Sequence, residues 1–247
     1  MSASVPSAST VVLVRDGVDG VETFLMRRVA TMAFAPRMHV FPGGRLDDAD
    51  RAARVTLIGA DLDELARRAS ADPDELHALY SCAVRETREE VGIELATVNC
   101  DGGMQIDVEA LPLVDHWVTP EGGSRRYDVR FFAAMIVGED VRLCTTEADE
   151  GGWLRPGDAL AAFAAGEFPL LAPTEHVLRW LDGFDAAADV IRAGGERSVI
   201  PLLPVRVPDD AGVTRWILVN DRTREVVRDP HVAPHTRESD GLPMEST

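Results

Sequence analysis

Short runs of apolar residues, either continuous or alternating with polar residues, mark several expected β-strands. Residues 9–17 and 21–29 form two such runs around Gly-Val-Asp-Gly, a sequence that favours a tight hairpin. The other strand patterns lie further along the chain, at residues 94–100, 111–120, 127–137, 200–210 and 213–220. The last two runs are close enough in sequence to form a second hairpin.

Apolar residues at helical intervals predict helices at residues 62–69 and 72–92. Asp72 followed by Pro73 suits the start of the longer helix, and Gly92 suits its end. Later patterns predict a short strand leading into a helix and then two more helices, at residues 151–167, 173–184 and 185–194. Residues 32–50 have no regular pattern and contain a Pro-Gly-Gly turn.

Strands with helices between and after them favour a mixed fold, an α/β or α+β sandwich. We expect residues 1–8, which are small and polar, to form a flexible tail, and residues 9–185 to form the main domain. Residues 186–228 then form a C-terminal extension packed on that domain. Residues 229–247 are rich in charge, Pro and Ser, and are expected to be disordered.

Charge indicates which partners the protein can bind, and cysteine content indicates where it is located. The chain has 42 acidic and 25 basic residues, a formal net charge of −17. Such a surface repels nucleic acids and anionic lipids, so neither is an expected partner. No apolar run approaches the roughly 20 residues that span a bilayer. Three widely spaced cysteines favour reduced thiols and a cytoplasmic location.

The long predicted helix ends in a dense charged stretch that contains Arg85, Glu86, Arg88, Glu89 and Glu90. A helical projection places both arginines on the solvent side and two of the glutamates, Glu86 and Glu90, at the edge of the apolar face. One interpretation is a surface helix with ion pairs such as Arg85 with Glu89. The other is a metal site, because clustered carboxylates at the edge of a core favour a hard cation such as Mg²⁺ or Mn²⁺.

The turn before this helix favours the second interpretation. Phe-Pro-Gly-Gly at residues 41–44, followed by Arg85-Glu86-x-x-Glu89-Glu90-x-Gly92, resembles the Nudix hydrolase signature. The family's first glutamate position is Asp50 here. The family places seven residues between that position and its arginine, whereas 34 residues lie between Asp50 and Arg85. The difference is an insertion of 27 residues, which includes about residues 51–71 and leaves the helix intact.

The resemblance extends to peroxisomal-type coenzyme A diphosphatases that have an insertion inside the Nudix box. The shared segments, over roughly residues 10–180, read FLMRR, HVFPGG, RLDDAD, WVTP, RRYDVRFF and EADEGGWL. A tighter motif of other coenzyme A Nudix enzymes has Arg and Gly before the turn. Those positions are Ala33 and Arg37 here, so that motif is absent.

This resemblance implies a Nudix α/β/α sandwich with a mixed sheet and extra helices. It implies a diphosphatase that uses Mg²⁺ or Mn²⁺ on a small nucleotide-diphosphate substrate, and a possible homodimer. The implied metal ligands are Glu86, Glu89 and Glu90. Arg85 would orient these carboxylates, and the general base would be Glu89, Glu90 or a loop glutamate, with Glu147 favoured slightly over Glu150.

Candidate phosphate-binding groups come from basic residues and from the glycine turn. The set expected to contact substrate is Arg28, Arg37, Gly43, Gly44 and Arg126. Phe34 and Trp117 are aromatic residues that could stack on an adenine or form part of the core. Three functions remain open at this stage: a coenzyme A diphosphatase, a diphosphatase for other nucleotides, and a non-catalytic nucleotide-binding module. The three intact glutamates argue against the third.

Overall fold

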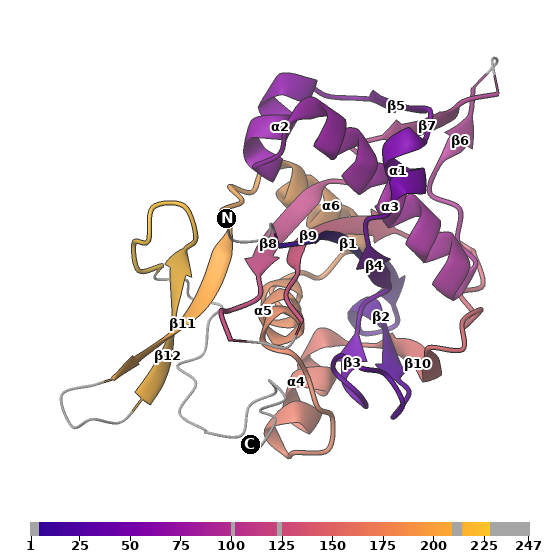
Figure 1. Ribbon diagram of the computed structural model, residues 1–247. Helices are drawn as coiled ribbons and strands as arrows, with labels where there is room; N and C mark the ends of the chain where they lie inside the picture. Colours follow the sequence, from indigo (N-terminus) through magenta and orange to yellow (C-terminus); the bar gives the residue numbers. More distant parts are fainter. Residues whose placement is uncertain (1–4, 100–101, 123–124, 209–213, 228–247) are drawn as a thin grey trace.

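The computed structural model describes residues 5–99, 102–122, 125–208 and 214–227. A large mixed sheet lies between two layers of helices (Figure 1). Its strands are β1 Ser7–Gly17, β2 Gly20–Arg28, β3 His39–Val40, β4 Gly43–Arg45, β8 Leu113–Val118, β9 Asp128–Met135, β10 Ala148–Leu154, β11 Leu202–Pro208 and β12 Thr214–Asn220. The helices of the described residues are α1 Asp48–Ala52, α2 Leu62–Ala69, α3 Pro73–Val91, α4 Pro156–Ala164, α5 Ala172–Leu181 and α6 Ala187–Glu196. The predicted α/β sandwich is confirmed.

The strand order of the large sheet is β10-β2-β1-β9-β8-β11-β12, with β3 pairing with β2 and β4 with β1. β1 and β2 form the expected hairpin, closed where Gly17 lies opposite Gly20. β1 begins at Ser7, and Ala8 pairs with Arg45 and Val129. The prediction of a flexible tail to residue 8 was therefore wrong for its last two residues, which belong to the sheet.

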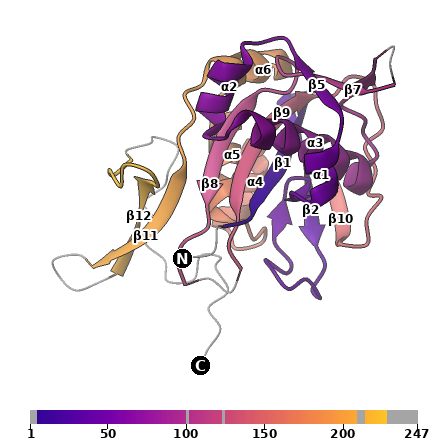
Figure 2. The same cartoon turned by 45° about the horizontal axis from the view of Figure 1, so that its top comes forward.

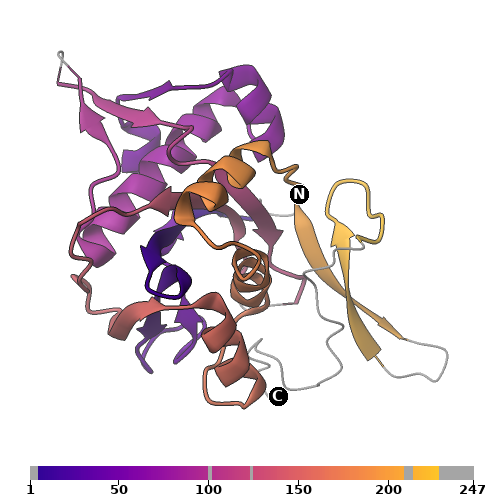
Figure 3. The same cartoon turned by 180° about the vertical axis from the view of Figure 1, so that it is seen from behind.

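Alternation along β1 supplies both halves of the core, because successive side chains of a strand point to opposite faces. Val11 and Leu13 join the apolar cluster under α3, whereas Val12 and Val14 join the cluster that contains residues of α5 and α6. Figure 2 shows α1, α2 and α3 on one face of the sheet, and Figure 3 shows α4, α5 and α6 on the other. The centre of the sheet is therefore covered on both sides.

The long helix α3 begins and ends where the sequence predicts. The Asp72 side chain accepts a hydrogen bond from the Glu75 amide, and Pro73 occupies the first turn. Gly92 ends the helix in the left-handed conformation, with φ of 74°. These signals fix the register of the acidic residues in the last turns of α3.

The insertion forms structure of its own. Its strand β5 Val55–Ile58 joins β7 Met104–Asp107 and β6 Thr97–Val98 in a second sheet of three strands. Neither β5 nor β7 was predicted, and the strand expected at 94–100 is reduced to the two residues of β6. Arg68 of α2 donates to carbonyls of Gly194, Gly195 and Arg197 around the end of α6. These bonds tie the insertion to the C-terminal part of the chain.

The C-terminal segment extends the sheet. β11 pairs in parallel with β8 through Leu202 and Trp117, and β12 pairs antiparallel with β11, which confirms the second hairpin. The hairpin projects from one side of the molecule (Figure 1). The tail expected at residues 229–247 lies outside the described residues. None of the helices in the described part of the chain is long and apolar enough to cross a membrane.

Candidate active site

Asp50 and Arg85 pair despite the insertion between them. The Arg85 guanidinium donates from Nε to Asp50 Oδ1 at 2.9 Å and from Nη2 to Asp50 Oδ2 at 2.7 Å. The Asp50 side chain is 1% exposed and also accepts from the Asp47 amide at the start of α1. A bidentate pair of this kind fixes the orientation of the guanidinium. The short helix α1 thus holds Asp50 beside α3.

Arg85 is not a solvent-facing residue, so the helical projection was wrong on this point. Its side chain is 19% exposed, whereas that of Arg88 is 56% exposed, as predicted. Arg85 Nη1 donates to Glu86 Oε1 at 2.8 Å and to Glu89 Oε2 at 3.3 Å. Its partner Asp50 lies on α1, which a projection of α3 alone does not include. Arg85 therefore contacts three carboxylates from two helices.

Two of the α3 carboxylates, Glu86 and Glu90, are largely buried. Burial raises the pKa of Glu86, an effect that Arg85 partly opposes. Burial raises the pKa of Glu90 to about 8, while a hydrogen bond from the Gly43 amide to Glu90 Oε2, at 2.7 Å, acts in the opposite direction. Carboxylates in this environment favour a nearby positive charge, since a cation stabilises their ionised form.

The glycine turn is packed against these carboxylates. A Cβ atom at Gly44 would lie 2.2 Å from Glu86 Oε1, and one at Gly43 would lie 2.4 Å from the Ser9 carbonyl oxygen. Only glycine allows such close approach without moving a neighbour. The turn between β3 and β4 thus brings backbone against α3 and leaves no room for side chains at these two positions.

The carboxylates line a cavity of about 900 Å³. The predicted site residues that line it are Arg28, Gly43, Gly44, Glu86, Glu89, Glu90 and Glu147. Arg37 and Arg126 do not line it, so the structure does not place them with the other candidates. Arg126 donates from Nε to the Thr119 carbonyl, and its neighbour Arg125 lines the cavity instead. Both arginines lie before β9 begins at Asp128, so the alternation expected of a strand does not fix which of them faces inward.

The two loop glutamates, Glu147 and Glu150, lie in different surroundings. Glu147 lines the cavity, with Oε2 lying 3.8 Å from Arg28 Nη2. Glu150 instead pairs with Arg27, and its side chain is 63% exposed. Arg28 is also oriented by a hydrogen bond from its Nε to the Phe34 carbonyl, at 3.2 Å. Glu147 and Arg28 therefore face the same space as Glu90.

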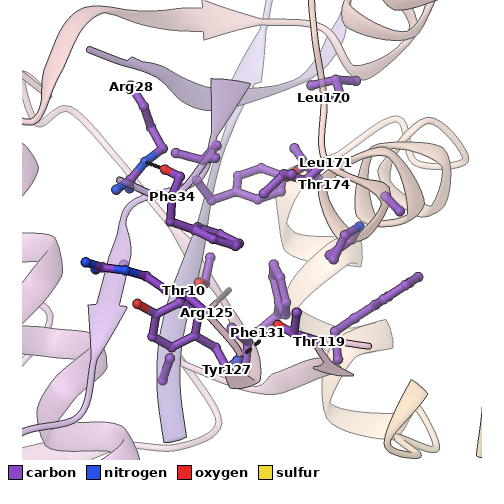
Figure 4. Close-up of a pocket in the computed structure, with 18 of the residues that line it drawn as sticks. Thr10, Arg28, Phe34, Thr119, Arg125, Tyr127, Phe131, Leu170, Leu171 and Thr174 are labelled. Atoms are coloured by element: carbon purple, nitrogen blue, oxygen red, sulfur yellow. Dashed lines mark hydrogen bonds between the residues drawn. The ribbon is translucent and has the colours of Figure 1, made fainter. Parts of the chain in front are cut away.

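Part of the cavity wall was not predicted from sequence. Its apolar side includes Tyr127, Phe131, Leu170, Leu171, Trp216 and Leu218. Phe34 meets Tyr127 edge-on, with ring centroids 5.4 Å apart (Figure 4). Trp117 also borders the cavity, but it is buried and donates its indole N–H to Asp115 Oδ2. These residues lie in ordinary apolar strand and helix patterns, which do not distinguish a cavity wall from a core.

The donor chemistry of the α3 carboxylates fits a divalent cation. Three carboxylates line one wall, and hard oxygen ligands are those that Mg²⁺ and Mn²⁺ prefer. Among the described residues, no three acidic, His or Cys side chains are already gathered as a metal site. Arg85 holds Glu86 and Glu89, and the Gly43 amide holds Glu90. Each of these bonds engages one carboxylate oxygen, so the second oxygen of Glu86, Glu89 and Glu90 is left to bind a cation.

Known proteins resemble the chain in both sequence and fold. No protein-family model matches it. The crystal structure of a NUDIX hydrolase from Alicyclobacillus acidocaldarius has a TM-score of 0.66 and 28% identity, and the match covers 78% of this chain and 97% of that one. Nudix hydrolase 7 of Caenorhabditis elegans is 25% identical over 166 residues. These findings support membership of the Nudix hydrolase superfamily.

The match to the Caenorhabditis elegans protein is partial. It covers 62% of this chain and 53% of the relative, so the chain matches about half the length of that protein. The match to the Alicyclobacillus structure spans nearly all of that Nudix protein, and this supports the fold assignment for most of the chain. The branch of coenzyme A diphosphatases suggested by the sequence stays a prediction.

Asp50→Ala is expected to lower the free energy of unfolding by roughly 3 kcal/mol, because Arg85 would lose a buried bidentate partner. Asp50→Asn keeps an acceptor for the Asp47 amide and should cost less. Chemical denaturation of the wild-type protein and of each variant measures the change in the free energy of unfolding. Arg27→Ala is the control, since it removes an exposed pair with Asp149 and Glu150 and should change stability little. Equal effects of Asp50→Ala and Arg27→Ala would contradict the structural role of the pair.

Proposed function

We propose that the chain is a metal-dependent hydrolase that cleaves the diphosphate linkage of a nucleoside-diphosphate compound, with coenzyme A or acyl-coenzyme A as the preferred substrate. The single observation that carries the proposal is the position of Glu86, Glu89 and Glu90 on the wall of a large cavity. The likeness to Nudix hydrolases supports a hydrolase acting on a pyrophosphate bond.

The proposed roles follow from where the side chains lie. Glu86, Glu89 and Glu90 would hold the divalent cation. Once bound, such a cation neutralises phosphate oxygens and lowers the pKa of a bound water. Arg28 faces the cavity and would bind a phosphate oxygen in place of its distant contact with Glu147. Arg85 would orient the carboxylates, as its present bonds to Glu86 and Glu89 do.

The general base would be a carboxylate that faces both the cation and the attacking water. Glu90 is buried beside the cavity, and because burial raises its pKa, a bound cation would favour the ionised form that can accept a proton. Glu147 lines the same space from the loop before β10. Hydrolysis forms a bond between the water oxygen and one phosphorus, and the bond from that phosphorus to the bridging oxygen breaks. The departing phosphate keeps the bridging oxygen.

The coenzyme A assignment is supported by the shared segments in the sequence, from FLMRR to EADEGGWL. A substrate panel tests it. Coenzyme A, acyl-coenzyme A, ADP-ribose, NADH and diadenosine polyphosphates are incubated with the protein and Mg²⁺ or Mn²⁺, and the products are identified by mass spectrometry. We expect 4′-phosphopantetheine and 3′,5′-ADP from coenzyme A. Turnover of another compound without these products would transfer the assignment to that compound's class, and binding without turnover of any would favour a non-catalytic module.

A further inference from the structure

Among the residues that the structure describes, three arginines line the cavity: Arg28, Arg45 and Arg125. Arg28 already has partners, the Phe34 carbonyl at 3.2 Å and Glu147 at 3.8 Å. Arg45 and Arg125 are exposed, and their side chains make no hydrogen bond or ion pair with any described residue. The cavity wall therefore carries two guanidinium groups that no carboxylate of the described chain contacts.

Most arginines in the described part of the chain have an anionic or carbonyl partner. Acidic residues outnumber basic ones by 42 to 25, and arginines such as Arg27 and Arg155 contact carboxylates. Arg54 is exposed and also has no such partner, but it lies on the insertion and does not line the cavity. Arg45 and Arg125 differ from it because they face the space in which a polyanion is expected.

The register of the sheet places Arg45 on the cavity side. Ala8 of β1 pairs with Arg45 of β4 on one side and with Val129 of β9 on the other. Paired residues of neighbouring strands share a face of the sheet, and all three of these residues line the cavity. Two strand spacings separate β4 from β9, or about 10 Å. The small side chain of Ala8 leaves room between them.

The connection between β8 and β9 presents Arg125 to the same cavity. The Thr119 amide donates to the Tyr127 carbonyl at 2.8 Å, and the Tyr127 amide donates to Thr119 Oγ1 at 3.0 Å. Arg126 Nε donates to the Thr119 carbonyl at 3.0 Å. Arg125 and Tyr127 both line the cavity, and Figure 4 shows them close together. Arg126 therefore anchors this connection, whereas Arg125 is available to a ligand.

We propose that Arg45 and Arg125 bind a phosphate monoester that the substrate carries in addition to its diphosphate. The proposal rests on the diphosphatase function proposed above and adds the residues that select among nucleotide-diphosphate compounds. Arg28 and the cation held by α3 would meet the diphosphate, so a further dianion needs cations of its own. The guanidinium fork matches phosphate oxygens, and two such forks suit a dianion better than a carboxylate. A 2′- or a 3′-phosphate on the ribose supplies this chemistry.

The test compares ligands that differ only in that phosphate. Coenzyme A is paired with 3′-dephospho-coenzyme A, and NADPH, which has a 2′-phosphate, is paired with NADH. Each compound is titrated into the full chain in the presence of a chelator, so that calorimetry measures binding without turnover. We expect the phosphorylated member of one pair to bind at least about tenfold more tightly, and that pair identifies the ribose position. Equal affinities within both pairs would overturn the proposal.

Two variants test the assigned residues. Arg45→Gln and Arg125→Gln are each expected to reduce the preference for the phosphorylated ligand by about fivefold or more. Arg54→Gln is the matched control, because it removes the same charge from an exposed arginine that does not line the cavity. It should keep the wild-type preference. Both test positions are exposed, so the variants should fold. An unchanged preference in either folded variant would overturn the assignment of the pair.

Activity assays separate this proposal from the diphosphatase function. If both members of each pair are hydrolysed with the same kcat/KM and bind equally, the diphosphatase function stands and the phosphate site fails. If none of the four compounds is hydrolysed with Mg²⁺ or Mn²⁺, but the phosphate preference and its loss in Arg125→Gln are found, the phosphate site stands and the hydrolase proposal fails.

Discussion

Glu90→Gln is expected to lower kcat by about a thousandfold while the protein stays folded. Glu90 combines a position on the cavity wall with burial that raises its pKa to about 8. Glutamine keeps the shape and an oxygen that can accept from the Gly43 amide, but it carries no charge and cannot take a proton. Because burial disfavours the charged form, the neutral side chain should leave thermal stability unchanged or raise it.

The measurement combines steady-state kinetics with a melting curve for each protein. Glu94→Gln is the matched control, since Glu94 lies just beyond α3 and is 50% exposed. It contacts Arg88 at 3.9 Å and accepts a hydrogen bond from the Ala96 amide, which glutamine can also accept. We expect wild-type kinetics from it. Wild-type turnover by folded Glu90→Gln would contradict the proposed roles of Glu90 in metal binding and in catalysis.

Removal of divalent cations is expected to lower activity by about a thousandfold or more, with recovery on addition of Mg²⁺ or Mn²⁺. Without a cation, the carboxylates Glu86, Glu89 and Glu90 would face the negative phosphates. The nearby arginines, Arg28, Arg45 and Arg125 on the cavity wall and Arg85 bonded to Glu86, would offset this repulsion only in part. Activity is measured after dialysis against a chelator and again after each metal is restored. Full activity in the chelated protein would contradict the assigned role of these carboxylates.

The local elements of the fold were predictable because their signals are short-range. Asp72, Pro73 and Gly92 define the ends of α3, and the Gly-Val-Asp-Gly turn defines the first hairpin. The small second sheet was not predicted, because β5 and β7 are short and are stabilised by pairing across about 50 residues of sequence. Its strands carry no alternating pattern long enough to distinguish them from loops.

The candidate site was predictable in its helix and less so in its surroundings. The motif identified Glu86, Glu89 and Glu90, but the pairing of Asp50 with Arg85 depends on how the insertion folds back. The choice of Arg125 over Arg126 depends on the direction of the chain before β9. The apolar wall depends on α5 and β12, whose positions are set by tertiary packing. The expected homodimer and cytoplasmic location stay predictions.

Titration with Mn²⁺ measures whether the α3 carboxylates hold a divalent cation at the cavity. Electron paramagnetic resonance measures free Mn²⁺ during titration of the wild-type protein and of a variant with Glu86, Glu89 and Glu90 all changed to Gln. We predict saturable binding by the folded wild-type protein and its loss in the folded variant. Equal binding by both proteins, or no binding by the wild type with or without a nucleotide diphosphate, would contradict it.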